Sequence, residues 1–337
     1  MPSHKAVQVT SAGAPLELAE VETTPPARGE VRISVRACGI CGTDPHFVSG
    51  DFPGLSWPLT LGHEIAGKIA EIGPGVQDFA VGDRVAVGWF GGNCNHCAQC
   101  RKGLFIHCVN GKVPSWHYPG GYAESVAAPA TALARIPAEL SDAEAAPMGC
   151  AGVTTYNALR HTNALAGDRV AILGVGGLGH LGIQFARAMG FETIAINRGT
   201  AKKDDAIKLG AHHYVDSTDG DVAETLNDLG GVAVVLGTAG ASKAMAATVG
   251  GLQPRGELIT IGVTPEPLAV SPLQLITPGL SIIGHPSGTP SEIEDTMHFA
   301  VQTGVRAWIE ELPLAKAAEG YAALEQGRAR YRTVLTV

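Results

Sequence analysis

The sequence predicts a two-domain α/β protein, with a glycine-punctuated, barrel-like β domain and a doubly wound parallel sheet. Three observations support this prediction. Short strands of period 2 fill roughly the first 90 residues, residues 169–262 change to alternating strands and helices, and a further strand pattern closes the chain at 328–337. Because the closing strand is expected to rejoin the first domain, the parallel-sheet domain is expected to be an insertion. The predicted domains are 1–149 with 285–337, and 150–284.

Composition argues against a membrane-spanning protein and against a nucleic-acid-binding protein. The 337 residues are 45% hydrophobic, which suits a soluble protein with packed cores. No run of about 18 apolar residues occurs and no apolar signal segment opens the chain, so we expect no membrane span and a cytoplasmic location. The formal charge of −8 argues against a nucleic-acid partner.

The first domain is predicted from alternating strands at 5–9, 30–36, 65–72 and 81–87, with a Gly-Pro-Gly turn at 73–75. Two thiols and an imidazole that lie far apart in the sequence can meet around one metal ion: Cys41, His63 and Cys150. Three protein ligands with one open position are typical of a catalytic zinc site. Asp44 is expected to orient the imidazole of His63, whereas Cys38 is expected to be a buried core thiol.

A second metal motif is denser. Cys94, Cys97, Cys100 and Cys108 lie within one short stretch, as in a closed, tetrahedral structural zinc site. An iron–sulfur cluster is the alternative, but the bacterial ferredoxin spacing requires a fourth cysteine after three residues and a following proline. Here the gap is seven residues and valine follows. His96 and His107 are alternative ligands that four cysteines make unnecessary.

The alternating region opens with a buried strand at 169–173. Gly174, Gly176, Gly177, Leu178 and Gly179 then form a GxGxxG turn that leads into a helix predicted at 178–189. Such a turn brings backbone close to a pyrophosphate at the helix N-terminus. Further strands are expected at 193–197, 214–216, 232–236 and 257–261, and a helix at 200–209.

The end of the second of these strands indicates the coenzyme. NAD-binding proteins place Asp or Glu there for the ribose hydroxyl, whereas a nearby Arg suits a 2′-phosphate. Here the strand ends in Asn197 and Arg198, with Lys203 close behind. The sequence therefore predicts NADP(H) in preference to NAD(H). The alternative is that Arg198 is a solvated loop residue and the site accepts either coenzyme.

The remaining elements complete the domain plan. Ser141 and Glu144 fit a capping box that opens a helical turn, and small residues at 150–159 predict a helix at the domain crossover. An apolar strand is expected at 280–284 and a helix at 291–303. Pairing of the 280–284 strand across a two-fold axis would give a homodimer. A homotetramer, formed as a dimer of dimers, is the second expectation.

Taken together, these motifs resemble the zinc-dependent medium-chain alcohol dehydrogenases along the whole chain. Among these, the resemblance is strongest to the NADP(H)-dependent aldehyde reductases of the cinnamyl-alcohol-dehydrogenase type. The matching residues are the four-cysteine lobe, Cys-Gly-Ile-Cys-Gly-Thr-Asp at 38–44, Gly-His-Glu at 62–64, Cys-Ala-Gly-Val-Thr-Thr-Tyr at 150–156 and Gly-Val-Gly-Gly-Leu-Gly-His at 174–180. The resemblance implies a GroES-like β-barrel catalytic domain and a Rossmann coenzyme domain.

The resemblance also implies roles for single residues. Cys41, His63 and Cys150 would hold a catalytic zinc ion, the four-cysteine lobe a second one, and Glu64 would enter the inner sphere occasionally. Thr43 would take the alcohol proton and pass it through the coenzyme ribose to His46. Thr154 would face the nicotinamide and Arg332 would bind the pyrophosphate. Gly42 occupies a position at which many relatives carry a basic residue near the coenzyme phosphates. The resemblance therefore does not imply that phosphate contact for this chain.

The substrate expected from this resemblance is a small-molecule primary alcohol or aldehyde. Three tryptophans, Trp57, Trp89 and Trp116, fall near the metal motifs and are predicted to line an apolar pocket for an aromatic or medium-chain substrate; ordinary packing is the alternative for each. An NAD-dependent polyol dehydrogenase would use Glu as the third ligand, where this chain offers Cys150. A zinc-free quinone reductase would lack both metal motifs. A zinc-ribbon nucleic-acid module would explain the four cysteines alone, but the charge and the GxGxxG turn oppose it.

Overall fold

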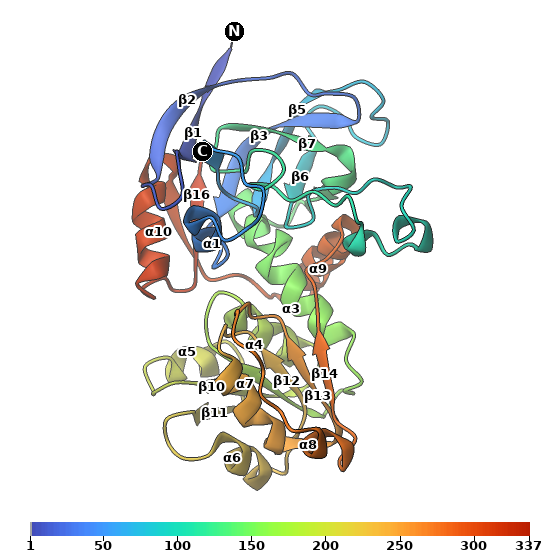
Figure 1. Ribbon diagram of the computed structural model, residues 1–337, viewed down its shortest axis with the longest axis vertical. Helices are drawn as coiled ribbons and strands as arrows, with labels where there is room; N and C mark the ends of the chain where they lie inside the picture. The colour runs from blue at the N-terminus through green and yellow to red at the C-terminus, as the bar shows by residue number, and fades with distance from the viewer. Residues whose placement is uncertain (1) are drawn as a thin grey trace. The chain divides into compact units, whose positions relative to one another are not determined.

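The computed structural model describes residues 2–337, which form two compact units. The first unit comprises Met1–Val153, Ser287–Gln302 and Arg306–Val337, and the second comprises Thr154–Pro286 with Thr303–Val305. The second unit is thus inserted between segments of the first, as the colour gradient in Figure 1 shows. No helix within residues 2–337 combines the length and the apolar character that a bilayer crossing needs.

The first unit is mainly β structure. Its strands are β1 (Ser3–Val9), β2 (Glu17–Glu22), β3 (Glu30–Gly39), β4 (Leu59–Thr60), β5 (Ile65–Ile72), β6 (Arg84–Val87), β7 (Ser125–Pro129), β8 (Ala134–Arg135), β15 (Ile309–Pro313) and β16 (Arg332–Thr336). Its helices are α1 (Asp44–Ser49), α2 (Asp142–Ala145), α9 (Pro290–Thr303) and α10 (Ala317–Glu325), with 3₁₀ turns η1 (Cys100–Lys102), η2 (Phe105–His107), η3 (Ala130–Ala132), η4 (Ala146–Gly149) and η6 (Leu314–Lys316).

Two sheets share this unit within the described residues. One has the order β2-β1-β4, and the other the order β15-β16-β3-β5-β6-β8, with β7 also pairing with β3. The alternation predicted for β3 produces buried Val31, Ile33 and Val35 on one face. β16 pairs antiparallel with the end of β3, at Cys38 and Gly39. The closing strand therefore borders the loop that carries Cys41.

The second unit is a parallel sheet with helices. Its strands are β9 (Arg169–Leu173), β10 (Glu192–Asn197), β11 (His213–Asp216), β12 (Val232–Gly237), β13 (Leu252–Thr260) and β14 (Ser281–Gly284). Its helices are α4 (Gly179–Ala188), α5 (Lys203–Lys208), α6 (Val222–Asp228), α7 (Ser242–Thr248) and α8 (Pro272–Ile276), with η5 (Val249–Gly251) before β13. Helix α3 (Ala151–Arg160) continues from one unit into the other.

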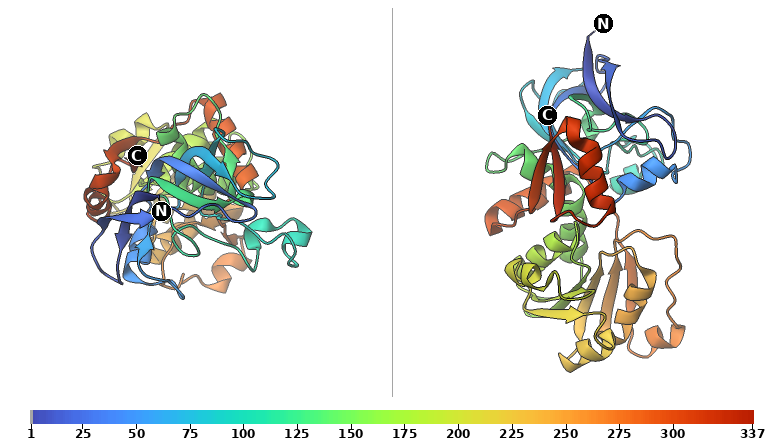
Figure 2. Two further views of the ribbon diagram at one scale, coloured as in Figure 1. Left: turned by 90° about the horizontal axis from the view of Figure 1, so that it is seen from above. Right: turned by 90° about the vertical axis from the view of Figure 1, so that its left-hand side faces the viewer.

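The strand order of the parallel sheet is β11-β10-β9-β12-β13-β14. In this order the chain moves outward from β9 in one direction and then returns to build in the other, which is the doubly wound arrangement. Figure 2 shows the same sheet from a second side. The predicted fold class is confirmed in both units.

Several boundaries differ from the sequence expectation. The strand expected at 81–87 begins only at Arg84, because Gly82 has a φ of 96° and its neighbours form a turn. The helix expected at 200–209 is shorter, and the expected closing strand 328–337 is limited to β16. The capping box at Ser141 and Glu144 is present as predicted.

Candidate metal centre and coenzyme site

Four buried side chains converge beside the end of β3. Cys41 follows β3, His63 and Glu64 precede β5, and Cys150 follows η4. Their ligand atoms all lie within 4.8 Å of one another, and the Cys41 and Cys150 sulfurs are 3.9 Å apart. Zinc–sulfur bonds of about 2.3 Å in a tetrahedron would place two sulfurs about 3.8 Å apart. The donor set therefore fits a zinc ion, and the structure brings together the ligands that the sequence proposed.

Asp44 organises two of these ligands. One of its carboxylate oxygens lies 3.4 Å from His63 Nδ1, and both side chains are fully buried. The other oxygen accepts hydrogen bonds from the Cys41 backbone N–H, at 2.8 Å, and from the Tyr122 hydroxyl, at 2.7 Å. His63 Nε2 has no hydrogen-bond partner among residues 2–337. A histidine oriented in this way leaves its second nitrogen for a metal.

The two thiols of this cluster differ in acidity. The Cys150 hydrogen bond holds the pKa of Cys41 well below its ordinary value, and the nearby His63 charge acts in the same direction. The same hydrogen bond raises the pKa of Cys150. Since the thiolate is the form that binds metal, Cys41 is the readier ligand of the pair.

Glu64 lies against Arg332 of β16, an ion pair that the sequence did not suggest. Arg332 Nη2 donates to Glu64 Oε1, and both side chains are almost completely buried. Burial raises the pKa of Glu64 to about 7, although the Arg332 charge opposes that shift. The other oxygen, Oε2, occupies the space beside Gly39, where an added Cβ would lie 2.0 Å from it. Gly39 thus makes room for this carboxylate.

Thr43 and His46 lie on the loop after Cys41 and in α1. The Thr43 hydroxyl oxygen is 3.8 Å from the Cys41 sulfur. His46 Nδ1 lies 2.8 Å from the carboxylate of Asp51, and 37% of the His46 side chain is exposed. Asp51 was not identified from the sequence, because no motif marks it. Its carboxylate orients the imidazole of His46 through Nδ1.

Aromatic side chains pack beside the metal ligands. The Trp89 ring meets the His63 ring edge-on with centroids 5.2 Å apart, and Phe52 lies between Trp89 and Trp116, at 6.1 and 4.7 Å. Trp116 also donates its indole N–H to the Pro53 carbonyl, at 3.0 Å. Trp57 is half-buried like these two tryptophans, but it makes no ring contact with them within residues 2–337. The structure thus groups Trp89 and Trp116, with Phe52 as a member that the sequence missed.

The four-cysteine lobe forms a second donor set, with ligand atoms within 4.8 Å of one another. The Cys108 sulfur is 3.5 Å from that of Cys94 and 3.9 Å from that of Cys97. Backbone and side-chain N–H groups point at the sulfurs, and the Asn110 amide lowers the pKa of Cys94 to about 5. These sulfur separations again fit a tetrahedral zinc site. His96 Nδ1 contacts the Cys94 carbonyl instead, at 2.6 Å.

The glycine turn of the second unit connects β9 to α4. Gly174 has a φ of 99°, and a Cβ on Gly179 would lie 1.8 Å from the Gly174 carbonyl oxygen, so side chains are excluded there. A Cβ on Gly176, by contrast, would meet nothing within 4 Å. Gly177 and Leu178 complete the turn, and α4 begins at Gly179. The turn leaves open backbone at the N-terminus of a helix, where a pyrophosphate can bind.

The end of β10 is tied to this turn. Asn197 Oδ1 accepts from the Val175 N–H at 3.2 Å, and Lys202 Nζ donates to the Val175 carbonyl at 2.6 Å. Arg198 and Lys203 are exposed, and their charged groups have no hydrogen-bond or ion-pair partner among residues 2–337. Thr154 is buried in α3. The free cations of Arg198 and Lys203 therefore lie beyond the end of β10, which is where proteins of this fold bind the adenosine ribose.

Comparisons with known proteins agree with this geometry. The family described as the alcohol dehydrogenase GroES-like domain matches residues 27–138, and the zinc-binding dehydrogenase family matches residues 177–302. An alcohol dehydrogenase of Aspergillus sp. (strain MF297-2) is 38% identical over 327 residues, covering 96% of this chain and 95% of its own. The chain belongs to the zinc-dependent medium-chain alcohol dehydrogenases.

Two solved structures resemble this dehydrogenase closely. A cinnamyl alcohol dehydrogenase of Sorghum bicolor superposes with a TM-score of 0.92 at 27% identity, covering 99% of this chain and 98% of its own. A dehydrogenase of Sinorhizobium meliloti 1021, solved with NADP bound, has a TM-score of 0.90 at 29% identity, with 100% of both chains covered. The GroES-like and Rossmann domains of the dehydrogenase are thus those expected from the sequence.

Within this dehydrogenase, the sequence-predicted residues fall into separate groups. The candidate metal ligands Cys41, His63 and Cys150 meet Thr43 and Glu64 in the first unit, the four cysteines form their own lobe, and the glycine turn meets Asn197 in the second unit. Arg332 lies with the first group, against Glu64. Its binding of a pyrophosphate stays a prediction, as do the roles of Thr154, Arg198 and Lys203.

Proposed function

We propose that this dehydrogenase transfers hydride between NADP(H) and the carbinol or carbonyl carbon of a primary alcohol or aldehyde, and that it holds two zinc ions per subunit. The observation that carries the proposal is the buried set of Cys41, His63 and Cys150, which offers three ligands and an open position. When bound, zinc supplies a Lewis acid that polarises a carbonyl or acidifies a hydroxyl, and the coenzyme supplies the hydride acceptor or donor.

The chain's own residues would manage the proton. Thr43 is placed beside Cys41 to accept a hydroxyl proton from the substrate. His46, held at Nδ1 by Asp51 and partly exposed, would exchange that proton with solvent through Nε2. Arg332 would compensate the charge of Glu64 behind the ligands whenever that carboxylate is ionised.

The preference for NADP(H) rests on the end of β10. The strand ends in Asn197 rather than in a carboxylate, and the free cations of Arg198 and Lys203 suit a 2′-phosphate. The Sinorhizobium meliloti dehydrogenase holds NADP in the same fold, and another solved structure of this fold is an NAD-dependent alcohol dehydrogenase, so the choice rests on the residues at the end of β10. The alternative is an NAD-dependent enzyme in which Arg198 is only a surface charge.

An aromatic or medium-chain substrate fits the side chains near the ligands. Trp89 contacts the His63 ring, and Phe52 and Trp116 extend the apolar surface away from it. Replacing Trp57 or Trp116 by Ala is expected to change the preference between a large and a small aldehyde, measured as the ratio of kcat/KM values. Equal losses for both aldehydes would contradict a substrate pocket at these tryptophans.

We further propose a cytoplasmic homodimer that acts on small molecules and binds no nucleic acid. β14 is the edge strand of the parallel sheet, and the side chain of Ile283 in it is 39% exposed. An exposed sheet edge is a template for pairing with a second chain, which supports a two-fold contact through 280–284.

The deciding experiment compares initial rates of aromatic aldehyde reduction with NADPH and NADH on one zinc-loaded preparation. NADPH should be preferred, and Arg198→Ala should raise the KM for NADPH by roughly tenfold or more, the effect of one charge-assisted contact. The KM for NADH should not change. Lys208→Ala, at the far end of α5, is the matched control. A wild-type preference for NADH would reject the NADP(H) assignment and leave the zinc chemistry standing.

A further inference from the structure

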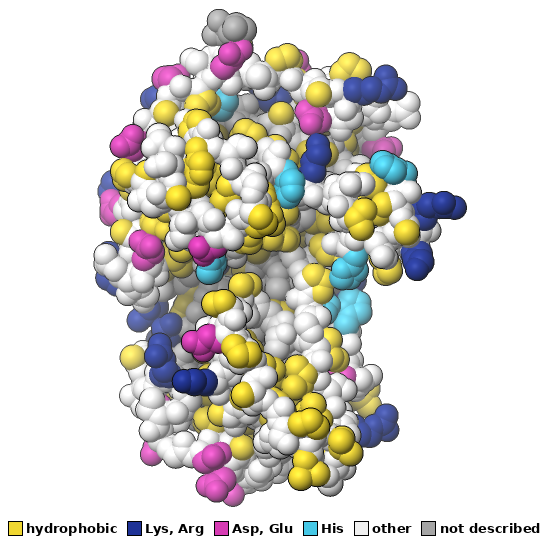
Figure 3. Space-filling view, in the orientation of Figure 1, with side chains coloured by type: hydrophobic (Ala, Val, Ile, Leu, Met, Phe, Trp, Pro, Cys, Tyr) yellow, Lys and Arg dark blue, Asp and Glu magenta, His cyan; other side chains and the backbone are white. Residues whose placement is uncertain are grey.

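One asparagine of the four-cysteine lobe lies in a chemically reactive sequence. The chain has seven asparagines, and only Asn110 is followed by a glycine, Gly111. Glycine has no Cβ to hinder the approach of its backbone nitrogen to the preceding side chain. Asn110 is exposed to water, and Figure 3 shows the lobe as a projection at the right of the view. Spontaneous loss of the side-chain amide, to which asparagine is prone, is therefore sterically open at this position.

This deamidation needs no reagent other than water. The Gly111 backbone nitrogen attacks the side-chain carbonyl carbon of Asn110. The new C–N bond closes a succinimide ring, and the side-chain nitrogen leaves as ammonia with the backbone amide proton. Water then opens the ring, adding hydroxyl to one of its carbonyl carbons and a proton to the ring nitrogen. The product is aspartate or isoaspartate, so an amide that donates hydrogen bonds becomes a carboxylate that only accepts them.

In the folded lobe, both reacting groups are held by cysteines of the donor set. The nitrogen that must leave, Asn110 Nδ2, donates to the Cys94 sulfur at 3.5 Å. The nitrogen that must attack belongs to a β-turn, in which the Gly111 N–H donates to the Cys108 carbonyl at 3.0 Å. Ring closure requires both hydrogen bonds to break. The turn must therefore open before Asn110 can react.

The lobe has little besides its cysteines to keep this turn closed. Leu104, Phe105 and Val109 are exposed and form no core. The ligand atoms of the four cysteines lie within 4.8 Å of one another, and thiolates that close repel one another when no cation lies between them. Such lobes are ordered by the metal they bind. A metal-bound lobe therefore keeps both hydrogen bonds, and a metal-free lobe releases them.

We propose that the metal of the lobe controls deamidation of Asn110, so that a lobe that loses its metal is converted into one that binds metal poorly. The new carboxylate removes the donor to Cys94 and adds negative charge beside four thiolates, whose charge already exceeds that of one divalent ion. Loss of such an outer partner lowers metal affinity by roughly 10- to 100-fold. The proposal rests on the lobe zinc of the proposed function, but not on its coenzyme or substrate.

Peptide mass spectrometry tests the control by metal. Zinc-loaded wild type, wild type stripped by a chelator and zinc-loaded Cys41→Ser are incubated together near neutral pH with a thiol reductant. Asn110 should lose its amide roughly tenfold faster in the stripped protein, because its turn is open for a larger fraction of the time. Cys41→Ser should match the loaded wild type, because Cys41 belongs to the other donor set. Asn95, an exposed asparagine of the same lobe that precedes histidine, should stay intact throughout.

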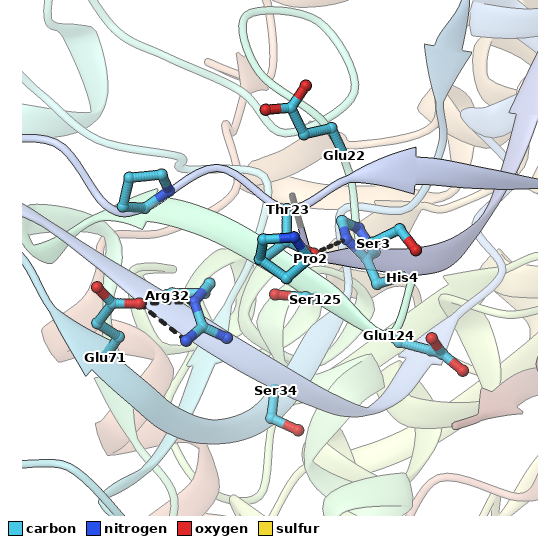
Figure 4. Close-up of a pocket in the computed structure, with 11 residues that line it drawn as sticks. Pro2, Ser3, His4, Glu22, Thr23, Arg32, Ser34, Glu71, Glu124 and Ser125 are labelled. Carbon is cyan, nitrogen blue, oxygen red and sulfur yellow. Dashed lines mark hydrogen bonds and ion pairs between the residues drawn. The ribbon is translucent and has the colours of Figure 1, made fainter.

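Hydrogen exchange measures the opening of the turn itself. The Gly111 amide should exchange faster in the stripped protein. The reference is the Lys5 amide, which donates to Glu124 at 2.8 Å beside a cavity of about 430 Å³ on the β1–β2 side of the unit (Figure 4). The lobe projects away from β1 and β2 in Figures 1 and 2, so the Lys5 amide should exchange equally with and without metal.

Asn110→Gln separates the modification from the loss of metal. It keeps a side-chain amide, and the larger ring that glutamine would have to form closes far more slowly. In the Cys41→Ser background, where the other donor set is broken, the lobe is stripped, incubated and titrated with zinc. The chain with Asn110 should bind zinc roughly 10- to 100-fold more weakly than before incubation. The chain with Asn110→Gln should keep its starting affinity.

Each outcome decides the proposal. Equal deamidation in loaded and stripped wild type, or equal recovery of zinc with Asn110 and with Asn110→Gln, would overturn it. If zinc-loaded Cys41→Ser held no zinc, the lobe zinc of the proposed function would be rejected together with this inference. If it held zinc and the deamidation rates were equal, this inference alone would fail. Neither result depends on hydride transfer or on the choice between NADP(H) and NAD(H).

Discussion

The two cysteine-containing groups of potential metal ligands are built in opposite ways. Cys41 and Cys150 are 109 residues apart and buried, and they meet because β3, β5 and η4 bring them together. Cys94 and Cys108 are only 14 residues apart, on a lobe with little core of its own. In the first site the fold imposes the geometry on the ligands, whereas in the second the ligands impose the geometry on the chain. The first should therefore lose chemistry when a ligand is removed, and the second should lose structure.

The largest expected effect is on catalysis. Cys41→Ser or Cys150→Ser should lower kcat/KM by roughly 1000-fold, because several kcal/mol of Lewis-acid stabilisation is lost and each 1.36 kcal/mol is tenfold. The melting temperature should change little, since the surrounding strands remain packed. Steady-state rates, metal analysis and thermal unfolding measure these quantities together. A variant that keeps a tenth of the activity would show that neither thiol holds the reactive metal.

Removal of a lobe ligand should reverse this pattern. Cys97→Ser should leave most of the activity but lower the melting temperature by roughly 3 °C, which corresponds to about 2 kcal/mol for a protein of this size. Limited proteolysis should cut between residues 94 and 108. If the melting temperature and the protease pattern of Cys97→Ser matched those of the wild type, the structure of the lobe would not depend on the Cys97 sulfur.

A smaller effect is expected from the space beside Glu64. Gly39→Ala places a Cβ 2.0 Å from the unperturbed position of Glu64 Oε2 and must displace the carboxylate. We expect kcat to fall by roughly tenfold, about 1.4 kcal/mol, with both zinc ions retained. Gly42→Ala is the control, because its added Cβ would meet nothing within 4 Å. Similar kinetics for Gly39→Ala and Gly42→Ala would show that the position of the Glu64 carboxylate does not affect the rate.

The smallest expected effect concerns pH. The pKa of Glu64 is raised from 4.5 to about 7 by burial, so between these values the folded protein binds more protons than the unfolded chain. Stability therefore decreases as pH rises through this window. In metal-depleted protein, Glu64→Gln should remove this slope, changing the free energy of unfolding near pH 7 by on the order of 1 kcal/mol relative to pH 5. Urea unfolding of both proteins at pH 5 and pH 7 measures the difference. If the free energy of unfolding changed with pH equally in the wild type and in Glu64→Gln, Glu64 would not be the source of the slope.

The same contrast explains what the sequence could predict. The four cysteines, the glycine turn and the Ser141 capping box are local patterns, so spacing alone was enough to indicate their structures. The fold class followed from periodicity. The ligand set around Cys41 spans the chain, and it was identified by the resemblance to a family as much as by chemistry.

Contacts between distant polar residues were not predictable. The Tyr122 hydroxyl reaches Asp44 across 78 residues, and Arg332 reaches Glu64 across 268. Neither pair has a spacing that indicates contact, because only the register of β16 on β3 places Arg332 there. Asp51 is near His46 in sequence, but an aspartate after a short helix is ordinarily a solvated turn residue. Such partners become visible only when the sheet is known.

The pairing of β16 with β3 has a consequence for biosynthesis. The backbone of Ile40, next to the ligand Cys41, donates to the Thr333 carbonyl, and Glu64 gains its cation only from Arg332. While the ribosome is still making the inserted coenzyme domain, the N-terminal segment has its thiols but lacks the strand that seals them. A metal site at Cys41, His63 and Cys150 would thus gain the contacts of β16 only after residues 332–336 have been synthesised, whereas the four cysteines of the lobe are present far earlier.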